Sequence, residues 1–173
     1  MILDMNFVLG LNLNKPISFN RICSLAYLYQ ISGVISNVSF KLPSKGIGSS
    51  DIEKQLTSML DKGYIVETRE GYTNTSYFNA YIDNYVLTNL EYTYLEDISK
   101  LISYTTEDLV YLCTVSILLD KLLQEEAYKN IDNLQQKLKN ILSFMYPERD
   151  AEDLETAFGI LNKLKEIRHE YQR

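Results

Sequence analysis

The sequence predicts an α+β protein that is mostly α-helical, and three features support this fold class. Amphipathic helical patterns with capping residues recur along most of the 173-residue chain. One stretch, residues 64–82, is instead rich in aromatic and β-branched residues on both sides of a glycine-containing turn. From residue 88 onward the patterns are helical throughout. A hydrophobic content of 46% is enough for one substantial core or two small ones.

The first patterned segment lies between residues 5 and 14. Apolar residues alternate there with a period near two, which predicts a short strand, with a helix as the alternative. A strand in this position has an edge that a second copy of the chain can pair with, so the segment also suggests a route to a homodimer. The alternating apolar residues are Phe7, Leu9, Leu11 and Leu13.

An amphipathic helix is predicted from Ser18 to Gly33. Its apolar residues recur at helical spacing, Ser18 is suited to cap its start, and Gly33 stands where a helix end favours positive φ. The residues that follow, 34–41, are β-branched and half alternating, a pattern typical of a strand, and residues 43–48 have the composition of a loop.

A second helix leads directly into a β-hairpin. Ser50 and Glu53 have the spacing of a capping box at the start of this helix, and Gly63 ends it. Two β-rich runs, residues 64–68 and 76–82, then flank a polar turn, which predicts the two strands of the hairpin.

The order helix, loop, helix, hairpin is that of a winged helix, with a recognition helix followed by a wing, and we assign it to residues 1–87. Residues 88–173 predict a C-terminal lobe of about four helices packed on that domain. The boundaries of these helices are marked by Thr88 with Glu91, Thr105 with Asp108, the apolar pattern of residues 131–142 before Pro147, and Asp150.

The charge of the chain is unevenly distributed. Residues 1–89 contain 7 Lys and Arg and 7 Asp and Glu, whereas residues 90–173 contain 10 and 16. The predicted recognition helix has a net charge of −1 between Ser49 and Lys62. Because phosphate binding depends on Lys and Arg, this distribution argues against a dedicated nucleic-acid binder.

The residue groupings of known enzyme classes are missing from the sequence. The single histidine, His169, lies near the end of the last predicted helix, where an exposed side chain is expected. Cys23 and Cys113 both fall in apolar helical pattern and are expected to be buried thiols. The signatures of zinc, redox and hydrolase sites do not occur. We therefore expect no enzymatic activity, no catalytic or metal-binding residues and no cofactor.

Fourteen tyrosines are the unusual feature of the composition. Several of them fall in or just after the predicted hairpin, and tyrosine is enriched both in strands and at protein interfaces. Ordinary strand packing is one explanation, and an aromatic binding face on the wing is the other. On the second interpretation the candidate partner-binding residues are Tyr72, Tyr77 and Tyr81, with the nearby cations Lys54 and Arg69.

Between Pro16 and Arg168 the chain resembles the YwgA-like proteins and the broader SocA-type (Panacea) antitoxin superfamily of bacteria and phages. The resemblance rests on residues 20–29, on residues 40–66, and on Phe144-x-x-Pro147 followed by the pattern of residues 153–161. The Tyr-Gly-Pro turn of that family is replaced here by residues 41–49, so no role of that turn is carried over.

The resemblance implies a protein that binds other proteins. Members of the superfamily look like antitoxins that recognise a toxin, adaptors for a protease, or small subunits of larger defence complexes. A winged-helix transcriptional regulator that binds DNA is the alternative function. The opening residues have no export signal and no stretch is apolar enough for a membrane span, so we expect a cytoplasmic location and no membrane partner.

Overall fold

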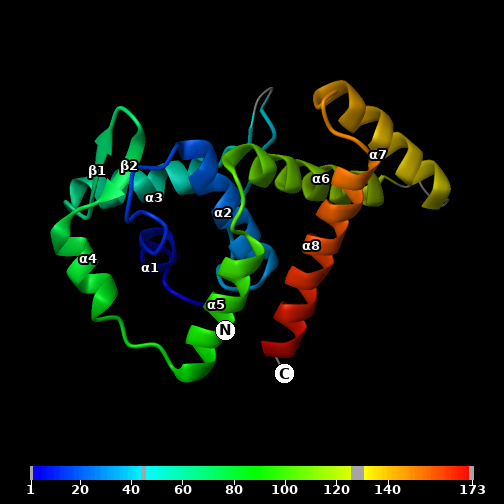
Figure 1. Cartoon of the computed structure of the whole chain (residues 1–173). Coiled ribbons are helices and arrows are strands. Elements are labelled where there is room, and N and C mark those ends of the chain that lie inside the picture. Colours follow the sequence, from blue (N-terminus) through cyan, green and yellow to red (C-terminus); the bar gives the residue numbers. More distant parts are fainter. Residues whose placement is uncertain (1, 44–45, 126–130, 172–173) are drawn as a thin grey trace.

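The computed structural model describes residues 2–43, 46–125 and 131–171, and it is mostly helical with one small antiparallel sheet (Figure 1). This confirms the predicted α+β, mostly α class. The elements in chain order are α1 (Met5–Gly10), α2 (Phe19–Ile31), α3 (Ser50–Asp61), β1 (Ile65–Thr68), β2 (Gly71–Asn74), α4 (Ser76–Asp83), α5 (Asn89–Leu101), α6 (Thr106–Gln124), α7 (Ile131–Met145) and α8 (Ala151–Tyr171).

The predicted N-terminal strand is wrong, because residues 5–10 form the short helix α1. The Asp4 side chain caps this helix by accepting a hydrogen bond from the Phe7 backbone N–H at 3.0 Å. Residues 7–10 are all buried, and α1 lies between α2 and α4 (Figure 1). Because residues 7–10 are all buried, the pattern of apolar residues in this segment cannot distinguish a strand from a helix. The segment also has no exposed strand edge, so the predicted route to a homodimer is wrong as well.

Helices α2 and α3 are confirmed. Ser18 caps α2, and the two helices are followed by Gly33 at a φ of 80° and Gly63 at a φ of 67°. The cap of α3 is Ser49 rather than the predicted Ser50. Residues 34–41 are not a strand of a sheet. Their polar backbone is satisfied partly by the Gln30 side chain, which bonds both the N–H and the carbonyl of Val38.

The predicted β-hairpin is present, but its second strand lies earlier in the chain than predicted. Strands β1 and β2 pair antiparallel from Ile65 opposite Asn74 to Thr68 opposite Gly71, with a two-residue turn between them. Gly71 has a φ of 129°, and a side chain there would collide with the Ile17 carbonyl oxygen. The backbones of Ile17 and Tyr72 are joined by hydrogen bonds of 3.0 and 2.9 Å, which attach the hairpin to the start of α2.

Residues 76–82, predicted as the second strand, form helix α4 instead. The Thr75 hydroxyl oxygen accepts a hydrogen bond from the Phe78 backbone N–H at 3.3 Å and so caps the helix. Aromatic residues are common in strands, but Phe78 and Ile82 are spaced four apart and both face inward against Gly10 of α1. Tertiary packing therefore overrides the local strand preference of this run.

The four C-terminal helices are confirmed as α5 to α8. Thr88 and Glu91 form the predicted capping box of α5, and Thr105 caps α6. Helix α6 is buried from residue 109 to residue 117 and packs against α2, while α8 packs against α5 (Figure 1). In α5, Leu90 is exposed and Leu95 is buried. The side chain of Ile131 lies outside the described residues.

Within the described part of the chain, each helix taken alone falls short of the length and apolar content that a membrane crossing requires. Helices α5 and α6 reach that content only as a pair, and this pair is bent by 101°.

Candidate functional site

Five aromatic side chains form a continuous row along α4 and the start of the hairpin. We call this set the aromatic row, and it consists of Tyr64, Tyr77, Phe78, Tyr81 and Tyr85. Phe78 stacks on Tyr64 with ring centroids 4.6 Å apart and on Tyr81 at 5.3 Å. Tyr77 lies 6.0 Å from Tyr64, and Tyr85 meets Tyr81 edge to face at 5.9 Å. Such offset and edge-to-face pairs hold rings in a defined arrangement.

The row is anchored to the core at two points. Phe78 is fully buried, and its ring edge approaches Gly10 so closely that a Cβ atom at that glycine would lie 2.6 Å from it. Tyr85 stacks on Phe7 of α1 with centroids 3.9 Å apart. A hydrogen bond of 2.8 Å from the Asn74 side-chain amide to the Gly10 carbonyl fixes the hairpin to the same place. The exposed rings therefore stand on a rigid base.

The aromatic row reaches the protein surface at Tyr77 and Tyr81. Their side chains are 67% and 43% exposed, and they are one helical turn apart on α4. Partial burial raises the pKa of Tyr81, and the negative charge of Asp4 raises it further, with Tyr85 and Tyr64 adding to the effect. The Tyr81 hydroxyl group is therefore a neutral donor at neutral pH, and both rings present apolar area to solvent.

The structure separates the predicted partner-binding residues into groups. Tyr77 and Tyr81 lie together, but on α4 and not on the hairpin where they were predicted. Tyr72 is in β2, where it is half-buried, and its pKa is raised by burial and by Glu67. Lys54 is exposed on α3, and Arg69 is exposed in the hairpin turn. None of these last three belongs to the aromatic row.

Sequence reasoning missed Phe78, which connects the exposed tyrosines to the core. A signal for it was present in the sequence. Thr75 has the N-cap residue type, and Phe78, Tyr81 and Tyr85 recur at spacings of three and four. This spacing is helical, and it places the three rings on one side of α4.

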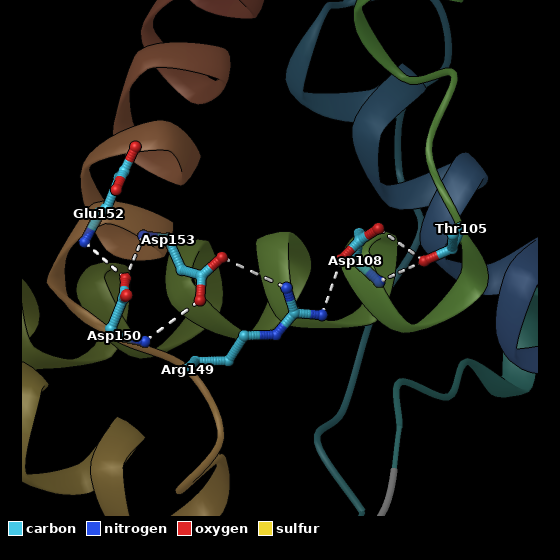
Figure 2. Close-up of polar contacts among 6 residues, drawn as sticks. All are labelled: Thr105, Asp108, Arg149, Asp150, Glu152 and Asp153. Atoms are coloured by element: carbon cyan, nitrogen blue, oxygen red, sulfur yellow. Dashed lines mark hydrogen bonds and ion pairs between the residues drawn. The ribbon is translucent and has the colours of Figure 1, made fainter.

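A polar cluster around Arg149, which lies between α7 and α8 in the chain, joins α6 to α8 (Figure 2). Its guanidinium Nη2 donates to Asp108 of α6 at 2.7 Å, and Nη1 donates to Asp153 of α8 at 3.4 Å. The same guanidinium lies 5.1 Å from the ring centroid of Tyr111. A hydrogen bond from Thr105 and the bond from Arg149 lower the pKa of the Asp108 carboxyl.

The role of the Arg149 cluster is structural, because it holds α6 and α8 together. Figure 2 shows the guanidinium between the two carboxylates, and Asp150 beside it caps α8 through the backbone N–H groups of Glu152 and Asp153. A cavity of about 470 Å³ opens next to the cluster, between the start of α6 and the end of α7, with Phe144 on its rim. Since Arg149 is already paired with two carboxylates, it offers this cavity no free cation.

In the part of the chain that the structure describes, cysteine and histidine side chains do not gather into a site. Burial raises the pKa of the Cys23 thiol to about 12, and burial also raises that of Cys113, so both stay protonated and unreactive. His169 is exposed near the end of α8, as expected. Among the described residues, no group of three His, Cys, Asp or Glu side chains is arranged to hold a metal ion.

No family model, curated protein or solved structure matches this chain. The case for a function therefore depends on the chain's own residues, and the aromatic row is the surface that stands out among them.

Proposed function

We propose that this protein is a non-catalytic binding module that contacts a protein partner through the exposed end of the aromatic row. The observation that carries the proposal is the exposure of Tyr77 and Tyr81 on a base of stacked, buried rings. Large aromatic side chains at the surface are enriched in protein interfaces and frequently dominate their binding energy. The toxin, protease or complex subunit implied by the family resemblance is the class of partner that we propose.

Preorganisation makes the row well suited to binding. Tyr81 is held by ring contacts on two sides, and Tyr77 is held by its contact with Tyr64. Ordering a free side chain at an interface costs roughly 0.5–1.5 kcal/mol. Rings that are already ordered avoid most of this cost, and a tyrosine also offers a hydroxyl group to the partner.

The alternative function, DNA binding by a winged helix, is favoured by the order of α2, α3 and the hairpin. Lys54 on α3 and Arg69 in the turn are exposed and could reach phosphates. The exposed positions of α3 also include Glu53 and Asp61, which repel phosphates. Charge therefore supports the protein partner over DNA. Binding to a labelled duplex that weakens steeply with added salt would favour the DNA alternative.

The experiment that tests the proposal is a pull-down of the tagged chain from its native cells after nuclease treatment. Wild type is compared with Tyr77→Ala/Tyr81→Ala and with Phe144→Ala, a control that removes a ring 90% exposed elsewhere on the molecule. We expect one stoichiometric protein that is lost from the double variant and retained by Phe144→Ala. Equal recovery with all three chains would refute the assignment of the surface.

A further inference from the structure

The cavity of about 470 Å³ between the start of α6 and the end of α7 has the size of a ligand site. Small-molecule sites in proteins have volumes of roughly 300–1,000 Å³. Of the described residues that line this cavity, none belongs to α4, to the hairpin or to the aromatic row. What the cavity binds is therefore a question separate from the partner of the aromatic row.

Much of the lining is apolar or aromatic. Val110 of α6 is buried beside the cavity, whereas Phe144 and Met145 at the end of α7 are exposed. The Tyr146 ring is held in place by a hydrogen bond of 3.0 Å between its hydroxyl group and that of Thr114. A ligand with an apolar body would cover Phe144 and Met145, and removal of that area from water would stabilise the complex.

The unpaired charges of the lining are negative. Glu107 in the first turn of α6 and Glu148 after α7 are both exposed, and neither carboxylate has an ion-pair partner among the described residues. The guanidinium of Arg149 also borders the cavity, but it is paired with Asp108 and Asp153 (Figure 2). A ligand therefore meets two carboxylates and no unpaired cation from the described lining.

This combination of apolar and acidic groups selects for a ligand that is both apolar and positively charged. An anion would be repelled by both carboxylates. The rings of Phe144 and Tyr146 attract a cation through their faces in addition to contacting apolar groups. Because exposed ion pairs contribute little on their own, the charge and the apolar contacts must act together.

We propose that this cavity binds a small organic cation in which a protonated amine is joined to an aromatic or other apolar group. The amine pairs with the carboxylates of Glu107 and Glu148, and the apolar group packs against Phe144, Met145 and Val110. The binding is non-covalent and does not involve the aromatic row.

The test titrates the full chain with tryptamine and follows the indole fluorescence, which comes only from the probe because the chain has no tryptophan. 3-Propylindole, which lacks the amine, is the matched probe. We expect Glu107→Gln/Glu148→Gln to weaken tryptamine binding by about five-fold and Phe144→Ala by about three-fold. Asp61→Asn/Glu70→Gln removes two exposed charges outside the cavity and should change the affinity by less than about two-fold.

Three results would each overturn the cation site. They are the absence of saturable tryptamine binding, equal binding of the two probes, and equal weakening by the two charge-removing double variants, which would indicate attraction to the overall charge alone. Tyr77→Ala/Tyr81→Ala should bind tryptamine as wild type does, and a loss there would overturn the assignment to this cavity. The pull-down tests the aromatic row separately, so either proposal can fail alone. Circular dichroism spectra and Tm values verify that each variant is folded.

Discussion

Tyr77 and Phe78 are adjacent in the chain but occupy opposite environments. Tyr77 is mostly exposed, whereas Phe78 is fully enclosed between α1, α4 and the hairpin. The helical turn of about 100° per residue produces this difference. One residue therefore presents its ring to solvent, while the next packs its ring into the core.

The same substitution at these two positions should separate stability from binding. We expect Phe78→Leu to lower the free energy of unfolding by about 1–2 kcal/mol, because it changes the shape of a closely packed core side chain. Tyr77→Leu should change it by less than about 0.5 kcal/mol. Urea denaturation monitored by circular dichroism measures both. Equal destabilisation would mean that Tyr77 is a core residue and not a surface one.

The Arg149 cluster should make the free energy of unfolding depend on pH. The pKa of Asp108 is lowered from 3.8 in the folded protein, so its ionised form stabilises the fold above that pH, and this contribution is lost as the pH falls through the lowered value. We expect Asp108→Asn to cost about 1–2 kcal/mol at neutral pH, allowing for partial solvent exposure.

Urea titrations of Asp108→Asn and wild type at several pH values check this prediction. The difference in unfolding free energy should be constant above about pH 5 and should shrink as the pH falls below 3.8. The lowered pKa of Glu91, caused by hydrogen bonds from Thr88, affects both proteins equally. A difference that does not vary with pH would contradict the role of the Asp108 charge.

The conformation of the short helices in this fold depends on tertiary packing, whereas local sequence signals determine that of the long helices. Helices α2, α5 and α6 have capping residues and amphipathic patterns that the sequence makes visible, and all three were predicted. Helices α1 and α4 are only 6 and 8 residues long and rich in apolar or aromatic residues, and both were mistaken for strands. Burial against each other decides their conformation, although α4 also has a local helical signal in Thr75 and in the spacing of its aromatic residues.

The close approach of α1 and α4 is tested by Gly10→Ala. The added Cβ would lie 2.6 Å from both Phe78 Cε1 and Ile82 Cδ1, so these two side chains must move, with α4 where they cannot move alone. We expect a loss of about 1–3 kcal/mol in stability and weaker partner binding, because the exposed rings move with α4. Gly159→Ala is the control, since its Cβ meets nothing within 4 Å inside α8.

The control should be stabilised by about 0.5–1 kcal/mol, because alanine favours the helix more than glycine does. Thermal unfolding of the two variants therefore gives shifts of opposite sign. Destabilisation of Gly159→Ala to the same extent as Gly10→Ala would show that the contact between α1 and α4 is not the cause.

The charge at the end of α4 is tested by Asp83→Asn. Removing a negative charge from the C-terminal turn relieves an unfavourable interaction with the helix dipole, so Tm should stay constant or rise by about 1 °C. A marked drop in Tm would assign Asp83 a structural role instead.

At the scale of the whole molecule, the aromatic row and the buried ring that supports it come from three parts of the chain. Tyr64 precedes β1, Phe7 comes from α1, and the remaining rings come from α4 and the residue pair after it. The sequence predicted the mostly helical class, and the partner-binding role of the tyrosines near the hairpin remains a prediction. It could not predict the row, because ring stacking depends on contacts between segments that are distant in sequence. The winged-helix assignment and the two-domain division remain predictions.

The most direct test of a protein partner at the aromatic row is site-specific photo-crosslinking in native cells. Tyr77 is replaced by p-benzoylphenylalanine, and a second chain receives the same residue at Phe144, which is even more exposed and lies on α7. We predict one crosslinked protein from position 77, identified by mass spectrometry, that is not formed from position 144. Crosslinking from position 144 alone, or to nucleic acid from position 77, would contradict the central claim.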